Sequence, residues 1–320
     1  MGHDRAGESQ SKNLTYYKTS MSAVTEPATE PFNPRWAVTF GEVAILHVGG
    51  AEMGEGIREH GFSVPELERF RAMLAAKGAE CELVDVSAPL PTGEMQRTHA
   101  AATLVVRNGA QFFCDAGSEE AVPNVANMLR AEQQAIPYDR KFWNARQRKT
   151  LNKRARLNTT FGPTDVAASE DFRQPTVHKF PPHLAAFRAG LEVLLGAKAS
   201  GLNAEGNHYF ERKSGIGFHG DAERKIVICL SLGGSSVLRY QWRMPGSSEH
   251  TLPPVDVRVG HGDVYIMSEK ATGFDWKRRS KVRVVHGAGS DKYIAAKKKR
   301  KKRGGGSSRS AKRQKVPSNK

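Results

Sequence analysis

The pattern of apolar and polar positions separates a mixed N-terminal half from a strand-rich C-terminal half. From residue 207 to 296, short apolar and β-branched runs alternate with Gly, Pro and Ser, which is typical of a sandwich or barrel of short strands. Seven runs carry the pattern: 207–213, 216–219, 225–233, 236–244, 255–259, 262–268 and 281–287. Three more strands are expected in the N-terminal half: 36–49, 81–87 and 102–113.

Helices are expected between these strands. One spans 64–78, where Ser63 begins a capping box and Gly78 suits the C-terminal end. A second is expected at 119–135 and a third at 183–196, where apolar residues three and four positions apart indicate a face that packs against a sheet. Together with the strands, they predict an α+β fold.

Composition excludes several classes of protein. With 320 residues, the chain is long enough to bury a sizeable core. Cys81, Cys114 and Cys229 are far apart and odd in number, which argues against a disulfide framework and indicates a reducing compartment. No run of 18 apolar residues and no signal peptide is found, so we expect a soluble protein without a membrane partner.

The net charge of +16 is unevenly distributed. Residues 297–320 hold twelve Lys or Arg and no acid, and are expected to form a disordered tail that binds nucleic acid nonspecifically. The tail also has the form of a bipartite nuclear localisation signal, which predicts contact with the nuclear import machinery and a location in the nucleus, or in nucleus and cytoplasm. A second basic run, 140–156, lies inside the part expected to fold.

The candidate chemistry lies in the strand-rich half. His219 and Asp221 are two residues apart, so on an extended strand they point to the same face and can bind one metal ion. A second histidine would complete the 2-His-1-carboxylate set of non-haem Fe(II) oxygenases. His286 ends an alternating strand and is the preferred third ligand, whereas His250 and His261 lie in polar turns.

Five motifs occur in an order that resembles the AlkB-type branch of the 2-oxoglutarate- and Fe(II)-dependent dioxygenases. They are Asn207-His208-Tyr209, His219-Gly220-Asp221, Leu230-Ser231-Leu232-Gly233, the run 262–267 and His286. The segment 267–289 is further similar to AlkB-like proteins of algae, protists and large DNA viruses. This resemblance implies a double-stranded β-helix, that is, a jelly-roll or cupin-like barrel, with flanking helices and an N-terminal α/β extension.

The resemblance also implies a set of cofactors. His219, Asp221 and His286 would hold Fe(II), which would act with O2 and with 2-oxoglutarate as cosubstrate. Asn207 and Tyr209 would hydrogen-bond the carboxylates of the cosubstrate.

A basic residue after the distal histidine normally pairs with the far carboxylate of 2-oxoglutarate in this family. The arginine-rich C-terminal strand of the family is missing here. Lys292 is the first basic residue after His286 and is the candidate for this role, with Lys297 and Lys298 as rivals.

The basic segment 152–162 resembles the lid that covers the nucleotide in AlkB-type enzymes. Arg154 and Arg156 would contact phosphates, and Phe161 would stack on an extruded base. The alternative for this segment is a solvated basic face. The implied reaction is oxidative demethylation of an alkylated DNA or RNA base, with release of formaldehyde, as in DNA repair.

Four regions are therefore expected. These are a disordered leader (1–34), an α/β extension of unknown role (35–135), a dioxygenase domain with the basic lid-like segment (136–296) and the basic tail (297–320). Two alternatives stay open: a protein hydroxylase or demethylase on the same fold, and a nuclear nucleic-acid-binding protein without turnover.

Overall fold

The computed structural model of the protein describes residues 31–45, 52–53, 56–247 and 251–295. Apart from its last four residues, the expected leader lies outside the described residues, as do the basic tail, Lys297, Lys298 and His250.

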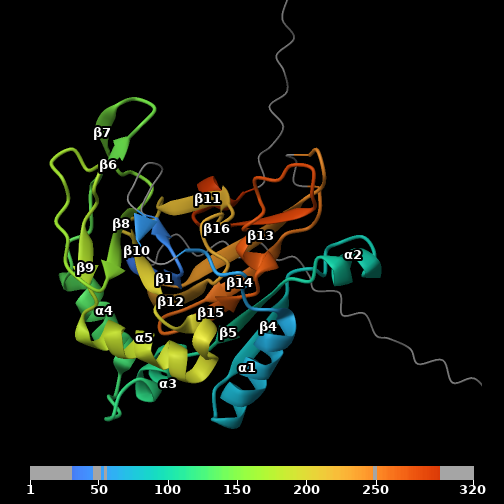
Figure 1. The fold of residues 1–320 in the computed structure, drawn as a ribbon, viewed down its shortest axis with the longest axis horizontal. Helices are drawn as coiled ribbons and strands as arrows, with labels where there is room; N and C mark the ends of the chain where they lie inside the picture. The colour runs from blue at the N-terminus through green and yellow to red at the C-terminus, as the bar shows by residue number, and fades with distance from the viewer. Residues whose placement is uncertain (1–30, 46–51, 54–55, 248–250, 296–320) are drawn as a thin grey trace, which may run out of the picture. The chain divides into compact units, whose positions relative to one another are not determined.

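The described strands form two main sheets (Figure 1). The larger has the order β4 (Cys81–Asp85), β5 (Ala102–Val106), β15 (Val264–Met267), β12 (Ile228–Gly233), β1 (Arg35–Gly41), β10 (Asn203–Tyr209), β8 (Leu157–Gly162) and β9 (Val177–Lys179). The smaller has the order β11 (Gly215–His219), β16 (Arg283–Gly289), β13 (Ser236–Arg243) and β14 (Val255–Val259). Two short pairs are separate: β2 (Ala44–Ile45) with β3 (Glu52–Met53), and β6 (Lys141–Asn144) with β7 (Lys149–Asn152). All these pairings are antiparallel except that of β8 with β9.

The helices connect and cover these sheets. They are α1 (Val64–Ala76), α2 (Gly93–Thr98), α3 (Gly109–Ala116), α4 (Val125–Ala135), α5 (Pro182–Leu195) and α6 (Asp291–Ile294), with 3-10 turns η1 (Ala197–Ala199) and η2 (Lys270–Thr272). The capping box at Ser63 is confirmed: the Ser63 hydroxyl accepts from the backbone N–H of Glu66, whose carboxylate accepts from the Ser63 N–H at 2.8 Å. The helix expected at 119–135 begins only at Val125.

The strand expected over 102–113 is wrong after Val106, because α3 begins at Gly109. Asn108 has a φ of 47°, which turns the chain away from the sheet. A Cβ at Gly109 would lie only 2.9 Å from the Cβ of Val264, so glycine allows the helix to start directly against β15.

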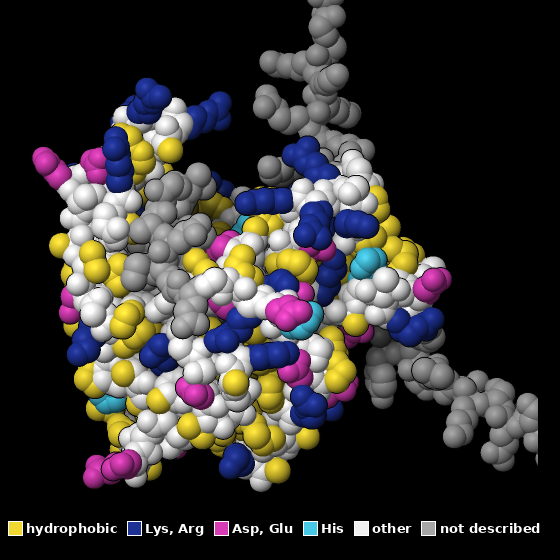
Figure 2. Space-filling model, viewed as in Figure 1, with side chains coloured by type: hydrophobic (Ala, Val, Ile, Leu, Met, Phe, Trp, Pro, Cys, Tyr) yellow, Lys and Arg dark blue, Asp and Glu magenta, His cyan; other side chains and the backbone are white. Residues whose placement is uncertain are grey.

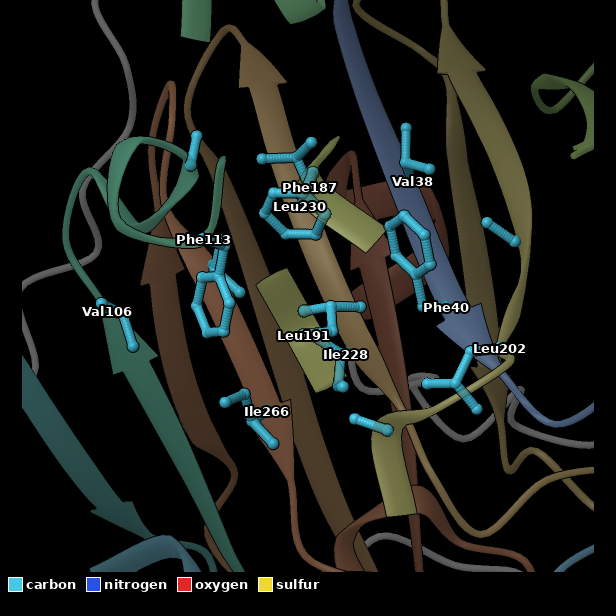
Figure 3. Packing of buried hydrophobic residues seen from close by; sticks show 14 of the residues in the cluster. Val38, Phe40, Val106, Phe113, Phe187, Leu191, Leu202, Ile228, Leu230 and Ile266 are labelled. Carbon is cyan, nitrogen blue, oxygen red and sulfur yellow. The ribbon is translucent and has the colours of Figure 1, made fainter. Parts of the chain in front are cut away.

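One face of the larger sheet is apolar and packs against α3 and α5 (Figure 3). Along β1, Trp36, Val38 and Phe40 are buried on this outer face, where Phe187 and Leu191 of α5 join them. The prediction that the helix at 183–196 packs against a sheet is therefore confirmed. Burying a side chain of this size contributes roughly 1.5–3 kcal/mol, so this layer is a main source of stability.

The other face of the larger sheet packs against the smaller sheet. At the β4–β5 end this second core is apolar and includes Trp242, whose indole N–H donates to the Val86 carbonyl at 2.7 Å, and Tyr240, bonded to the Thr103 hydroxyl at 2.7 Å. At the β10–β8 end the inner-face side chains are polar instead: Asn158, Thr160, Glu205, Asn207 and Tyr209. This polar end of the interior between the two sheets is called the chamber below.

The expectation of an α+β fold with helices on a large sheet is confirmed. The expected extension does not form a sheet of its own, since β1, β4 and β5 lie in the same sheet as β10, β12 and β15. No helix among the described residues is long and apolar enough to cross a lipid bilayer.

Candidate metal centre

Two histidines and one aspartate meet at the inner side of the smaller sheet. His219 ends β11 and lies directly opposite His286 of β16, and Asp221 follows two residues after His219. One ligand atom from each residue can be chosen so that all three lie within 4.8 Å of one another. No other His, Cys, Asp or Glu cluster of this kind occurs among the described residues.

The distances leave room for a cation. Nε2 of His219 lies 3.5 Å from one Asp221 oxygen, and Nε2 of His286 lies 3.7 Å from the other. These separations are too long for strong hydrogen bonds. Ligand atoms that bind one ion at about 2.1 Å are about 3 Å apart in octahedral geometry, so a small inward movement would complete a three-ligand site.

The tautomer of His219 is set by its neighbour. Its Nδ1 lies 2.8 Å from the Gly217 carbonyl oxygen, so Nδ1–H donates there and Nε2 keeps its lone pair for a metal. This is the usual arrangement of a metal-binding imidazole.

Electrostatics favour the ligating form of both buried residues. Burial lowers the pKa of His286 to about 4, so its imidazole is neutral near pH 7. Burial alone would raise the pKa of Asp221, but its electrostatic interactions with the neighbouring His286, Arg224 and His219 side chains hold that pKa below its usual value. A neutral imidazole and an ionised carboxylate are the forms that bind metal ions.

The turn that carries the ligands is fixed by a second segment. The Asp221 N–H donates to the Thr272 carbonyl of η2 at 2.9 Å. A Cβ on Gly220 would lie 2.2 Å from the Gly273 carbonyl oxygen and 2.7 Å from Cδ1 of Trp276. The middle residue of the His-x-Asp motif is therefore glycine because the segment after β15 packs directly on it.

Asn207 and Tyr209 lie on β10, on the face that looks toward the smaller sheet. The Asn207 side-chain oxygen accepts a hydrogen bond from Nε of Arg156. Lys292 lies elsewhere: it is exposed on α6, with its ammonium 5.2 Å from the centre of the Tyr293 ring and no described contact to Asn207 or Tyr209. Its expected role with the cosubstrate stays a prediction without a contact to support it.

Phe161 is placed where it cannot serve the expected role. Its ring is fully buried and pairs across β8 and β10 with Ala204, on the outer face that packs against the helices. The rings of His178 and Phe180 lie 6.2 and 6.1 Å away. Phe161 is therefore a core residue, and its assignment as a base-stacking side chain is wrong.

The basic segment separates into an exposed and an inward-facing part. Arg154 is exposed and the β6–β7 hairpin carries further cations, whereas Arg156 is partly buried and points into the chamber. Figure 2 shows Lys and Arg side chains at the tip of this hairpin, at the upper left. The ring of Trp143 in the hairpin packs under the Arg173 guanidinium at 4.3 Å.

Three inner-face charges were not singled out in the sequence. Glu205 lies two residues before Asn207. Arg224 is only 2% exposed, and its Nη2 lies 3.5 Å from a carboxylate oxygen of Glu205. Arg35 of β1 stacks on the Tyr209 ring at 4.3 Å. Glu205 could have been found, because its spacing from Asn207 predicts a shared face; Arg35 could not, because its pairing joins distant parts of the chain.

His261 is excluded as the third ligand by its contacts. Its Nδ1 accepts from the Gly233 N–H at 3.0 Å, and its Nε2 lies 3.1 Å from the Asn127 side-chain oxygen. Both ring nitrogens are engaged away from Asp221, so His261 is a turn residue.

Comparison with known proteins relates the chain to a viral protein. No family model matches the sequence. The chain is 33% identical over 260 residues to the uncharacterized protein R156 of Acanthamoeba polyphaga mimivirus, an alignment that covers 80% of this chain and 96% of the viral protein. With this identity over nearly the whole viral protein, the chain belongs to the same family as the mimivirus protein.

Proposed function

We propose that the protein is an Fe(II)- and 2-oxoglutarate-dependent dioxygenase with a jelly-roll barrel. The observation that carries the proposal is the convergence of His219, Asp221 and His286 beside a polar chamber. Two imidazoles and one carboxylate are the ligand set that leaves adjacent positions open in non-haem Fe(II) oxygenases.

The order of the strands supports the barrel. Along the chain from β10 to β16, consecutive strands alternate between the two sheets except at β13 and β14, which pair as a hairpin. Chains that cross in this way between two packed sheets are typical of jelly rolls.

The residues around the ligands fit the proposed cofactors. His219, neutral His286 and ionised Asp221 would hold Fe(II), and Asn207 and Tyr209 would orient 2-oxoglutarate. When bound, the iron and cosubstrate supply the oxidation of a substrate C–H bond by O2. The chain's own contribution is to hold three ligands, to keep the Asp221 carboxyl ionised and to limit water around it, since Asp221 is 8% exposed.

The basic hairpin supports a nucleic-acid substrate. Exposed Lys141, Arg146, Arg148 and Lys149 lie on or beside β6 and β7, and exposed Arg154 follows. Cations of this kind bind phosphates without reading the base, so they are consistent with DNA or RNA. We therefore propose demethylation of an alkylated base, in a protein that the basic tail directs to the nucleus. A protein substrate and a binding protein without turnover are the alternative outcomes of the test.

The experiment is 2-oxoglutarate turnover by the purified full chain with Fe(II) and ascorbate, with and without methylated single-stranded DNA or RNA. Formaldehyde that forms only with methylated nucleic acid, together with succinate, is the expected result. Succinate without formaldehyde would point to a different substrate. The Asp221→Ala variant should form neither product while keeping the wild-type melting temperature, and full activity in that variant would refute the proposed ligand set.

A further inference from the structure

The strand β1 occupies an unexpected place in the barrel. Among the residues that the structure describes from Asn203 onward, seven strands, β10 to β16, follow one another, whereas a jelly roll has eight. In the larger sheet, β10 and β12 are not neighbours; β1 lies between them and is antiparallel to both. A strand from the N-terminal part of the chain therefore lies between two strands of the C-terminal half.

The inner face of β1 borders an open space. Trp36, Val38 and Phe40 on its outer face are buried, but Arg35, Ala37 and Thr39 on its inner face are partly exposed. A strand hydrogen-bonded on both sides exposes one face only where the layer above it is incomplete. The space above β1 therefore reaches solvent, and Asn207 and Ser231 border it because they pair directly with Ala37.

Arg35 spans this space from one sheet to the other. It is directly opposite Tyr209 in the β1–β10 pairing, and its guanidinium carbon lies 4.3 Å from the centre of the Tyr209 ring. Its Nη2 lies 3.2 Å from the position that a Cβ on Gly289 would occupy. Gly289 is three residues past His286 on β16, so Arg35 places a cation beside the strand that carries the distal histidine.

A second arginine approaches Tyr209. Arg156 donates from Nε to the side-chain oxygen of Asn207, two residues before Tyr209 on the same face. Burial raises the pKa of the Tyr209 hydroxyl, and the charges of Arg156 and Arg35 oppose that rise. The nearby Glu205 carboxylate lies 3.5 Å from Arg224 and 4.0 Å from Arg156. The end of the chamber at Tyr209 is thus suited to an anion.

We propose that β1 replaces the eighth strand of the barrel and that its Arg35, with Tyr209, binds the far carboxylate of a small dicarboxylate whose other end lies at the candidate metal centre. The inference rests on the proposed function, in which that dicarboxylate is 2-oxoglutarate. It gives the segment 35–135 a role, since its first strand becomes part of the cosubstrate pocket. It also explains why no arginine is needed after His286 and why Lys292 can point to solvent.

The test compares two ligands that differ in one carboxylate. The Mn(II)-loaded full chain, which does not turn over, is titrated by calorimetry with 2-oxoglutarate and with 2-oxobutyrate, which lacks the far carboxylate. The Arg35→Gln variant should bind 2-oxoglutarate roughly 10- to 100-fold more weakly than wild type, the range for a lost charge-assisted hydrogen bond. It should bind 2-oxobutyrate and Mn(II) as wild type does. Arg35→Lys should recover part of the loss, and it serves as the second variant if Arg35→Gln does not fold.

Two matched variants sharpen the result. Arg130→Gln removes an arginine that lies over Trp36 on the opposite face of β1, and Lys292→Gln removes the rival cation; both should keep wild-type affinity for 2-oxoglutarate. Wild-type affinity in Arg35→Gln, or a loss confined to Lys292→Gln, would overturn the role of Arg35 and leave the proposed function intact. A wild-type chain that binds Mn(II) but neither ligand would overturn both.

Discussion

Gly220 lies between the candidate ligands His219 and Asp221. Replacing it tests the metal site without removing any of the three ligands. In Gly220→Ala, the new Cβ would lie 2.2 Å from the Gly273 carbonyl oxygen, where ordinary contact begins near 3.4 Å, so the two segments must part by more than 1 Å. The φ of Gly220 is not in the left-handed region, so the obstacle is contact alone. Gly273 cannot retreat easily, because its own Cβ position is 2.7 Å from the Val284 carbonyl oxygen.

The magnitude follows from these contacts. Overpacking a tight site costs about 1–3 kcal/mol, and loss of the Asp221 N–H bond to Thr272 adds about 1 kcal/mol. We expect a loss of about 2–4 kcal/mol in the free energy of unfolding, or roughly 5–10 °C in Tm. Since Asp221 moves with the turn, affinity for Co(II) should fall about 10- to 100-fold, the effect typical of changes next to metal ligands.

The assay is calorimetric Co(II) binding together with thermal unfolding. Gly217→Ala, three residues earlier on β11, is the matched control, because a Cβ there meets no heavy atom within 4 Å, and it should bind Co(II) like wild type. If Gly220→Ala keeps both the wild-type affinity and the wild-type Tm, the packing of the segment after β15 on the His-x-Asp turn is refuted.

Three further predictions test the charge of the site, the outer layer and the hairpin. Burial lowers the pKa of His286 from 6.5 to about 4. As the pH falls from 6.5 to 4, His286 therefore takes up a proton in the unfolded chain before it does so in the folded chain, which favours unfolding. The free energy of unfolding should fall by at most about 3 kcal/mol over this range. Chemical denaturation of His286→Gln should therefore show a smaller loss on acidification than wild type, and equal losses would contradict the buried neutral imidazole. Gly190→Ala should destabilise the fold by about 2–4 kcal/mol, because its Cβ would meet the Phe113 carbonyl oxygen where α3 crosses α5. The control is the same change at exposed Gly93, which should be neutral or slightly stabilising. Thermal melts measure both effects. The double variant Arg146→Ala/Lys149→Ala should lower the slope of log affinity against log salt for single-stranded DNA by about 1.4, whereas Arg69→Ala/Arg71→Ala on α1 should leave that slope unchanged.

Local patterns carried most of what could be predicted about the site. His219 and Asp221 share a face because side chains in a strand repeat every two residues, and the same alternation points His286 inward. Both inferences use only neighbours in the sequence. Phe161 fails for the complementary reason: which face of β8 looks toward the chamber depends on its pairing with β10, where Phe161 is opposite Ala204. Alternation within a strand cannot reveal which of its faces is the inner one.

The place of β1 shows the same limit on a larger scale. The next strands of the same sheet along the chain, β4 and β5, are not its partners. Strand β1 pairs instead with β10 and β12, roughly 160 to 200 residues away. Lys292 is the first basic residue after His286 in chain order, whereas the cation beside Tyr209 belongs to β1, the first described strand. Side chains meet according to which strands are adjacent in the sheet, and a strand from either end of a chain can fill the same gap. A cation that is missing from the last strand of a sheet can therefore be supplied by a strand from the other end of the chain, as we propose for Arg35.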